Sequence, residues 1–184
     1  MRILRTPRLT LEPVTLSNAD ALWRIMQAGG LREYQDVPRY SLDEFRERVA
    51  ARPKELHTHA SGRFEWLIAL TATRAPFGWV SLRLGEYGAG TAEMGYSLLE
   101  SGRRMGYAFE GVRAVLDEAF FEARMEAVEA ACVVGNEASQ KVLKSLGFTQ
   151  VRMQRNGAVV RSRAVDIYVF RMEGAIWKKA PGSP

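Results

Sequence analysis

The pattern of apolar and polar residues in the first half of the chain predicts short strands and helices in turn. Residues 8–12 alternate in strand fashion and end at Pro13, which has no N–H to donate to a sheet. Two stretches each begin with a capping residue and keep apolar residues on one helical face. Three later runs alternate again and are expected to pair as an antiparallel meander. The helices are expected within residues 17–29 and 41–53, and the strands at 64–71, 77–84 and 92–99.

In the second half of the chain the apolar residues change to helical spacing and then back to strand patterns. Asn136 can cap a helix that Gly147 ends. The dipeptide Asn156-Gly157 is typical of a tight turn, so a closing hairpin is expected around it. These elements are expected at residues 106–123 (helix), 128–134 (strand), 136–147 (helix), 151–155 and 165–170 (strands). We predict one α/β (α+β) domain over residues 1–173 and a frayed tail over 174–184.

Composition favours a single globular domain. The chain has 184 residues, of which 47% are apolar and 26% are charged, close to the averages of soluble globular proteins. One cysteine, Cys132, excludes an intramolecular disulfide framework and fits a reducing compartment. No apolar run approaches the ~20 residues of a membrane span, and the first ten residues lack a signal-peptide pattern. We therefore expect a cytoplasmic protein that does not cross a membrane.

The net charge of the chain indicates only a class of partner. Lys and Arg number 26 against 21 Asp and Glu, a net charge of +5, which favours anionic partners such as nucleic acid, an acidic protein or a phosphorylated cofactor. No nucleic-acid-binding motif is evident, so direct nucleic-acid binding is not expected. His57 and His59 have no evident third ligand beside them, and no metal site is predicted. Both a monomer and a homodimer are compatible with the sequence.

A small basic loop joins a predicted strand to a predicted helix between residues 96 and 108. The start of a helix presents unpaired N–H groups and a partial positive charge, which suit an anion. Gly106 and Ala108 allow close approach to the backbone, and Arg103 and Arg104 add charge. A diphosphate group fits this loop. The alternative is an ordinary strand-to-helix turn whose arginines are solvated.

A second signature, Asn136-x-x-Ser139 with Gly147-Phe148 at the end of its helix, follows one strand later. Together the two segments resemble the GNAT superfamily of acetyl-CoA-dependent N-acetyltransferases, whose pyrophosphate loop reads R/Q-x-x-G-x-G/A. Here it reads Arg103-x-x-Gly106-x-Ala108. The segments 6–13, 17–22 and 92–98 resemble the RimJ/RimL-type branch of that superfamily, and the resemblance covers residues 6–173.

The resemblance implies a fold and a reaction. The fold would be a mixed central sheet of about six or seven strands with a splayed middle, flanked by about four helices. The reaction would be direct attack of a primary amine on acetyl-CoA, with a protein N-terminal α-amino group as the acceptor typical of the branch. Two alternatives stay open: a small-molecule acceptor such as a polyamine, an amino acid or an aminoglycoside, and a noncatalytic module that binds acyl-CoA.

The resemblance also implies which residues meet the cofactor. Backbone groups of the splayed strand bind the pantetheine arm and the thioester oxygen, the basic loop holds the pyrophosphate, and the next helix adds contacts. These residues are Tyr96, Ser97, Leu98, Arg103, Arg104, Met105, Gly106, Tyr107, Ala108, Asn136 and Lys141.

Two residues are candidates for proton transfer. Glu93 lies on the strand that leads into the loop and is the candidate base; its alternative role is an exposed carboxylate or a salt bridge. Ser139 resembles the serine that hydrogen-bonds or protonates the departing sulfur in the RimJ/RimL-type branch. Because a serine hydroxyl is a poor acid, a capping role is its alternative.

The sequence also predicts residues of the acceptor site, and it departs from the GNAT pattern at two positions. Residues 31–40 and the loop 52–62 are expected to shape the acceptor site, with Glu33, Gln35 and Asp36 as amine contacts. Arg104 stands where many members carry glycine. Leu143 stands where other branches place the tyrosine that protonates the thiolate, so that acid is missing at this position.

Overall fold

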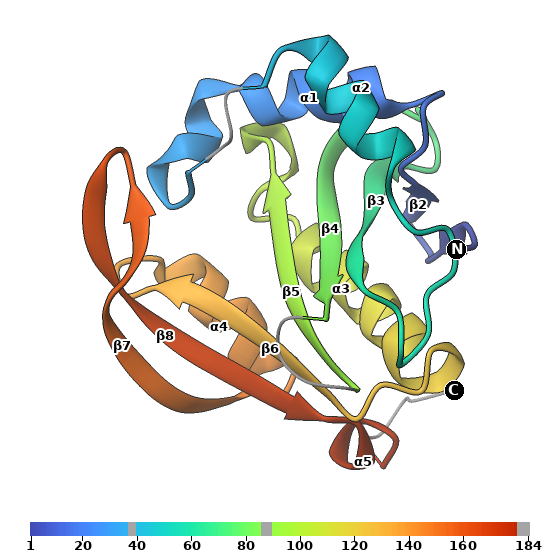
Figure 1. The fold of residues 1–184 in the computed structure, drawn as a ribbon. Coiled ribbons are helices and arrows are strands. Elements are labelled where there is room, and N and C mark those ends of the chain that lie inside the picture. The colour runs from blue at the N-terminus through green and yellow to red at the C-terminus, as the bar shows by residue number, and fades with distance from the viewer. Residues whose placement is uncertain (37–39, 86–89, 180–184) are drawn as a thin grey trace.

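A computed structural model describes residues 1–36, 40–85 and 90–179, and within them the chain forms one eight-stranded sheet with helices on both faces (Figure 1). The strands are β1 (Leu4–Arg5), β2 (Leu9–Pro13), β3 (Gly62–Leu70), β4 (Pro76–Leu84), β5 (Thr91–Leu98), β6 (Ala127–Val133), β7 (Thr149–Val160) and β8 (Arg163–Glu173). The helices are α1 (Ala19–Gln27), α2 (Leu42–Ala50), α3 (Tyr107–Asp117), α4 (Glu137–Ser145) and α5 (Gly174–Trp177), with 3-10 turns η1 (Gly29–Glu33) and η2 (Glu100–Gly102) and a π-helical turn η3 (Glu118–Glu122).

The predicted α+β fold and its mixed sheet are confirmed. The strand order is β1-β2-β3-β4-β5-β6-β8-β7, and β5 with β6 is the parallel pair among the described strands. The sheet exceeds the expected six or seven strands because the two residues of β1 pair with β2 ahead of the first predicted strand. In the described residues the fifth α-helix is the short α5.

Two apolar cores lie on opposite faces of the sheet. Side chains alternate along β3, so Trp66 and Ile68 join the core under α3 and α4, whereas Leu67 joins Trp79 in the core under α1 and α2. Burial of these large side chains, each worth about 1.5–3 kcal/mol, fixes the register of the meander. The sheet is thereby a rigid layer between two pairs of helices.

Local signals in the first half of the chain are confirmed at the start of α2. The Ser41 side chain accepts from the Glu44 N–H at 3.2 Å, and the Glu44 carboxylate accepts from the Ser41 N–H at 2.7 Å. This is the reciprocal capping box that the spacing predicts. The strands β3, β4 and β5 form the expected antiparallel meander.

The splayed middle of the sheet is also confirmed. Strand β5 pairs with β6 over four residues, ending with Met94 opposite Ala130. Beyond that point β5 continues alongside β4 to Leu98, while β6 continues alongside β8 to Val133. The two strands therefore diverge, and Figure 1 shows β5 and β6 opening away from their common end.

The closing hairpin forms with longer strands and a different turn from those predicted. Val160 pairs with Arg163, so Arg161 and Ser162 make the turn, with φ values of 51° and 62°. Two left-handed residues are what a two-residue hairpin turn needs. The predicted turn at Asn156-Gly157 is wrong: the dipeptide lies in a bulge of β7, where the register shifts between residues 154 and 158. A left-handed asparagine suits a bulge as well as a turn.

The segment after β8 is docked at its start. Residues 174–177 form α5, and Trp177 is buried with its indole N–H donating to Asp117 at 2.9 Å. The expectation of fraying from residue 174 is therefore wrong for this turn of helix, and residues 180–184 lie outside the described part. None of the described helices is both long enough and apolar enough to cross a membrane.

Candidate active site

The divergence of β5 and β6 creates an opening in the middle of the sheet. One wall is Gly95–Leu98 of β5, and the other is the end of β6. Main-chain groups of β5 that point toward β6 have no strand partner there beyond Met94. Unpaired backbone donors and acceptors next to a buried sheet are groups that a ligand can satisfy. The opening therefore offers hydrogen-bonding capacity in the middle of the sheet.

The opening has two sides, because alternate residues of β5 point to opposite faces. Tyr96 points toward α4, where its hydroxyl meets Ser139. Ser97 points toward η1, where its hydroxyl donates to Gln35 at 3.0 Å. We call these the α4 side and the η1 side of the opening.

The α4 side carries a pair of hydroxyl groups. The Tyr96 hydroxyl oxygen lies 2.9 Å from Ser139 Oγ and 3.2 Å from the Ser139 carbonyl oxygen, to which it donates. Burial raises the pKa of Tyr96, and hydrogen bonding with Ser139 lowers it only in part, so the phenol stays protonated at neutral pH. The Asn136 side chain accepts from the Ser139 N–H at 3.1 Å. Asn136 is thus the predicted cap of α4, and it fixes the position of Ser139.

Cys132 lies behind this pair as the small buried strand residue that the sequence predicts. Its Sγ lies 3.5 Å from the carbonyl oxygen of Asn136, and the residue is 4% exposed. Burial raises the pKa of the thiol, with hydrogen bonding to Ser139 opposing the shift. A thiol with a raised pKa is a weak nucleophile.

The start of α3 has the geometry expected of the predicted anion site. Gly106 adopts φ +78° directly before Tyr107, so the chain turns sharply into the helix. Residues 103–106 are exposed, and the first N–H groups of α3 point out of the helix end. Such an end attracts negative charge. Arg104 is also left-handed, with φ 61°, and exposed.

Arg8 supports this site and was missed by sequence reasoning. Its guanidinium donates to the Met105 carbonyl at 3.0 Å and to Glu110 at 2.6 Å, and lies 4.6 Å from the Tyr107 ring centroid. Thr6 donates to the same carboxylate. Burial alone would raise the pKa of Glu110, but the hydrogen bonds from Thr6 and Arg8 outweigh it and lower the pKa. In the sequence, Arg8 is only a polar residue of an alternating strand.

Arg103 lies elsewhere than predicted. Its Nε donates to the Leu98 carbonyl at 3.1 Å, and its Nη2 donates to the Gly30 carbonyl at 2.9 Å. The guanidinium therefore fastens η1 to the end of β5 and is turned to the η1 side. The predicted contact of this side chain with a phosphate group stays a prediction. Lys141 is exposed on α4, which leaves its predicted cofactor contact a prediction.

The η1 side brings together some of the predicted acceptor residues. Gln35 contacts Ser97, and its buried Nε2 has no hydrogen-bond partner among the described residues. Glu33 lines a hollow of about 380 Å³, together with residues from the tip of the β7–β8 hairpin. Asp36 is exposed, and residues 37–39 of the predicted segment lie outside the described part.

The loop 52–62 is not at this site. Gly62 pairs with Leu84, and Leu84 pairs with Ala92 at the closed end of β5. The loop therefore lies beside the beginning of β5, whereas the opening lies at its end. The prediction that this loop shapes the acceptor site is wrong, because the sequence alone does not show which end of the meander opens.

Glu93 takes the alternative role that the sequence left open. Its carboxylate forms a cross-strand ion pair with Arg83 of β4. It lies on the paired part of β5, four residues before Ser97, which is about 13 Å along the strand. Glu93 therefore cannot touch a group bound beside Ser97. Leu143 is fully buried in the core under α4, so no acid stands there.

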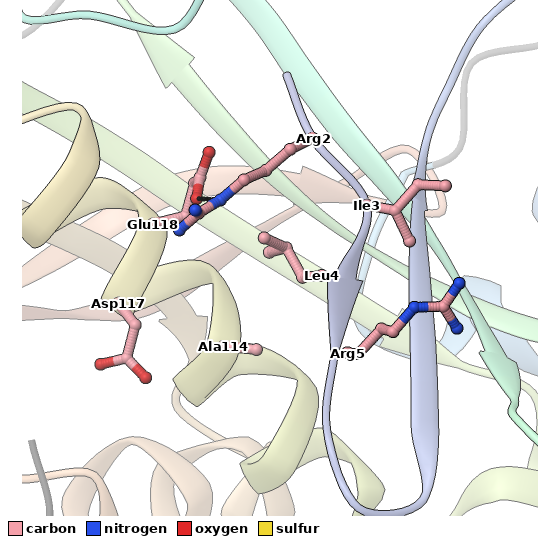
Figure 2. A pocket seen from close by; sticks show the side chains of 7 residues that line it. All are labelled: Arg2, Ile3, Leu4, Arg5, Ala114, Asp117 and Glu118. Atoms are coloured by element: carbon pink, nitrogen blue, oxygen red, sulfur yellow. Dashed lines mark hydrogen bonds and ion pairs between the residues drawn. The ribbon is translucent and has the colours of Figure 1, made fainter. Parts of the chain in front are cut away.

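Another hollow, of about 300 Å³, lies between β1 and α3 (Figure 2). There Arg2 pairs with Glu118, Leu4 points toward the helix, and Arg5 points away from it. Asp117 binds the Trp177 indole. The helical lining of this hollow, Ala114, Asp117 and Glu118, belongs to the second half of α3 and its continuation, about 10–16 Å from the anion site at the start of α3. The hollow is therefore separate from the opening.

The comparisons with known proteins agree with this geometry. Residues 8–149 match the family model described as acetyltransferase (GNAT) domain. The chain belongs to the GNAT acetyltransferase family. It is an acetyl-CoA-dependent N-acetyltransferase of the GNAT type, as the two sequence signatures indicated.

Related proteins match this chain over nearly its full length. The chain is 26% identical over 173 residues to "Uncharacterized N-acetyltransferase p20" of Bacillus licheniformis, covering 94% of this chain and 96% of the relative. Its structure resembles RimL, a ribosomal L7/L12 alpha-N-protein acetyltransferase in complex with coenzyme A, with TM-score 0.81, 21% identity and coverage of 94% and 98%.

A second structural neighbour has a different acceptor in its name. It is a chimera of spermidine N-acetyltransferase SpeG from Vibrio cholerae and hSSAT, with TM-score 0.80, 16% identity and coverage of 94% and 99%. At these identities the two likenesses show the fold of the GNAT acetyltransferase. They do not choose between a protein and a polyamine acceptor.

Proposed function

We propose that this GNAT acetyltransferase acetylates the α-amino group of a protein N-terminus. The observation that carries the proposal is the position of Glu93, which is ion-paired with Arg83 and far from Ser97 along β5. The group that Ser97 contacts is the neutral amide of Gln35. The open part of β5 is thus served by groups that orient an acceptor, with its candidate base at a distance.

An amine that binds in such a site has to lose its proton without help from an adjacent base. At pH 7 an α-amino group with a pKa near 7.8 is roughly 10–15% neutral, whereas a lysine or similar amine with a pKa near 10.4 is far below 1%. Without a base, deprotonating the second class of amine costs about 3.5 kcal/mol more than deprotonating the α-amine. Glu93 can assist only through intervening water, which favours the α-amine.

The residues present fit acetyl-CoA. The start of α3 offers N–H groups and the positive end of a helix for the pyrophosphate, and the unpaired edge of β5 offers main-chain groups for an extended amide chain. Acetyl-CoA supplies a thioester whose acetyl group the amine can attack. Main-chain donors of β5 that point into the opening can stabilise the charge that develops on the thioester oxygen.

Tyr96 and Ser139 are placed to manage the proton on the α4 side. Transfer forms a C–N bond, breaks the C–S bond, releases one proton from the amine and leaves a thiolate that gains one. The amine proton leaves to water. Ser139 Oγ–H can donate its proton to the thiolate when the Tyr96 hydroxyl, which burial keeps protonated, turns its single proton from the Ser139 carbonyl oxygen to Ser139 Oγ, and Ser139 then regains a proton from water. Ser139 thereby becomes a better donor than an isolated serine. We propose that this pair supplies the proton that a tyrosine supplies in branches where position 143 is not leucine.

A competition experiment tests the proposal. The purified protein is given acetyl-CoA and an equimolar mixture of spermidine, a peptide with a free N-terminus and no lysine, and a peptide with a blocked N-terminus and one lysine. We expect acetylation of the free N-terminus to exceed the other two by at least about tenfold at pH 7. Faster acetylation of spermidine or of the lysine peptide would contradict the proposal.

A further inference from the structure

We infer that Arg103 is a positioning residue for the acceptor, because its side chain holds residues 30–35 against the open end of β5. The inference rests on the proposed function, with the amine on the η1 side of the opening. It gives the side chain a role on that side, whereas the backbone of residues 103–106 leads into the start of α3. In this role Arg103 touches neither reactant and acts on the acceptor through Gln35.

The Arg103 guanidinium joins two carbonyl groups that are far apart in the sequence. Its Nε donates to Leu98, the last residue of β5, at 3.1 Å, and its Nη2 donates to Gly30 of η1 at 2.9 Å. The N–H donors of a guanidinium have a fixed, planar geometry, so the direction of one bond sets the direction of the other. The side chain therefore fixes how η1 lies relative to the end of β5.

The segment 30–35 is attached to β5 a second time. Ser97 donates to Gln35 at 3.0 Å, and Ser97 directly precedes Leu98 in β5. Gly30 and Gln35 are thus joined to two consecutive residues of the strand, Gly30 through Arg103 and Gln35 directly. The two ends of the segment are held at the same point of the opening.

The internal bonds of the segment give it little rigidity of its own. η1 is a 3-10 helix of five residues, a conformation whose hydrogen bonds have poorer geometry than those of an α-helix. Leu31 is 5% exposed in the core under α1 and α2, but Glu33 and Tyr34 are exposed. Exposed segments open at a low cost in free energy. Loss of the bonds from Arg103 therefore lets Gln35 leave Ser97 more often, which weakens the acceptor site.

The sequence motif gives Arg103 another partner, a phosphate group of acetyl-CoA, and the two roles predict different kinetics. Arg103→Met removes the donors and the charge but keeps a long side chain. We expect the KM for a peptide with a free N-terminus and no lysine to rise about fivefold, the effect of losing one hydrogen bond of ordinary strength. The dissociation constant for acetyl-CoA should change by less than about threefold at physiological ionic strength, where an exposed charge is screened.

The matched control is Arg124→Met, which replaces an exposed arginine between η3 and β6. Both constants should stay at their wild-type values in this variant. A loss of acetyl-CoA affinity in Arg103→Met that exceeds the loss in KM for the peptide would overturn the inference and assign the side chain to the cofactor.

A double variant tests whether Arg103 acts through Gln35. In the Gln35→Ala protein, Arg103→Met should raise the KM for the peptide by less than about twofold, because both changes act on the same segment. Multiplication of the two single effects, to about 25-fold, would overturn the inference. Absence of transfer to the peptide N-terminus would overturn the proposed function instead, and the same variants with spermidine as the acceptor would then test the role of Arg103.

Discussion

The two sides of the opening differ in how the chain builds them. The α4 side is assembled from short stretches: Asn136 and Ser139 are three residues apart, and the loop 103–106 runs directly into α3. The η1 side is assembled from three distant segments, around Gln35, Ser97 and the turn at Arg161. The capping and loop motifs of the α4 side, where we propose that acetyl-CoA binds, are therefore local in sequence, whereas the η1 side, where we propose that the acceptor binds, depends on tertiary structure.

The largest effect is expected on the α4 side, at Ser139. Ser139→Ala removes the hydroxyl that lies 2.9 Å from Tyr96 and should lower kcat about 100-fold, in the range of general acid catalysis. The affinity for acetyl-CoA should stay the same. Steady-state kinetics and calorimetry measure the two quantities.

Ser145→Ala, an exposed serine at the end of the same helix, is the control for Ser139→Ala and should leave kcat unchanged. An unchanged kcat in Ser139→Ala would reduce Ser139 to a structural residue of the helix start. The proposal that Ser139 donates a proton on the α4 side would then be contradicted.

A second large effect is expected at the anion site. Gly106→Ala places a side chain at φ +78°, a conformation that costs about 1–2 kcal/mol outside glycine, and the loop relaxes away from its geometry. The dissociation constant for acetyl-CoA should rise about tenfold. Gly135→Ala is the matched control, because a Cβ there meets nothing within 4 Å. Equal affinity of the two variants would show that the start of α3 does not hold the cofactor.

A smaller effect is expected at Gln35 and sharpens the distinction between the sides. Gln35→Ala removes the hydrogen bond to Ser97, worth about 1 kcal/mol, and should raise the KM for the amine about fivefold. The KM for acetyl-CoA should not change. Gln150→Ala, exposed on β7, serves as the control. A loss of acetyl-CoA affinity in Gln35→Ala would mean that the two sides are not separate sites.

The smallest effect concerns stability at the Arg8 clamp, the set of hydrogen bonds that joins Thr6 and Arg8 to Glu110 and Arg8 to the Met105 carbonyl. Glu110→Gln should lower the free energy of unfolding by about 1 kcal/mol at pH 7, because Thr6 and Arg8 lose their charged partner. The pKa of Glu110 is lowered in the folded protein, so its contribution is present above the unfolded pKa and is lost as the pH falls through the folded pKa. Denaturant titrations should therefore show the difference between variant and wild type shrinking below about pH 4.

The same contrast explains what the sequence could predict. The cap at Asn136 and the loop that enters α3 at Gly106 follow from residue type at a fixed spacing, so both were predicted. The hydrogen bond between Tyr96 and Ser139, and the Arg8 clamp, join residues far apart in the chain, and no local signal marks them. Sequence reasoning assigned Tyr96 only a backbone role, although its hydroxyl supports the predicted serine.

The errors arose where one local signal fits two structures. Asn156-Gly157 satisfies a turn and a bulge equally, and the pairing of Val160 with Arg163 decided for the bulge. Arg103 matches the phosphate motif, but its guanidinium also suits the nearby carbonyls of Leu98 and Gly30, to which it donates here. Such outcomes depend on which neighbours the fold supplies, which a spacing rule does not contain.

The most direct test of a cofactor site on the α4 side and an acceptor site on the η1 side is titration of the protein with acetyl-CoA by calorimetry, followed by a thiol-release assay with a free peptide N-terminus. We expect one acetyl-CoA to bind per chain and thiol release to begin only when the peptide is added. Absence of binding would contradict the assignment of the opening as the cofactor site. Binding without release on any amine would contradict catalysis and leave a module that only binds acyl-CoA.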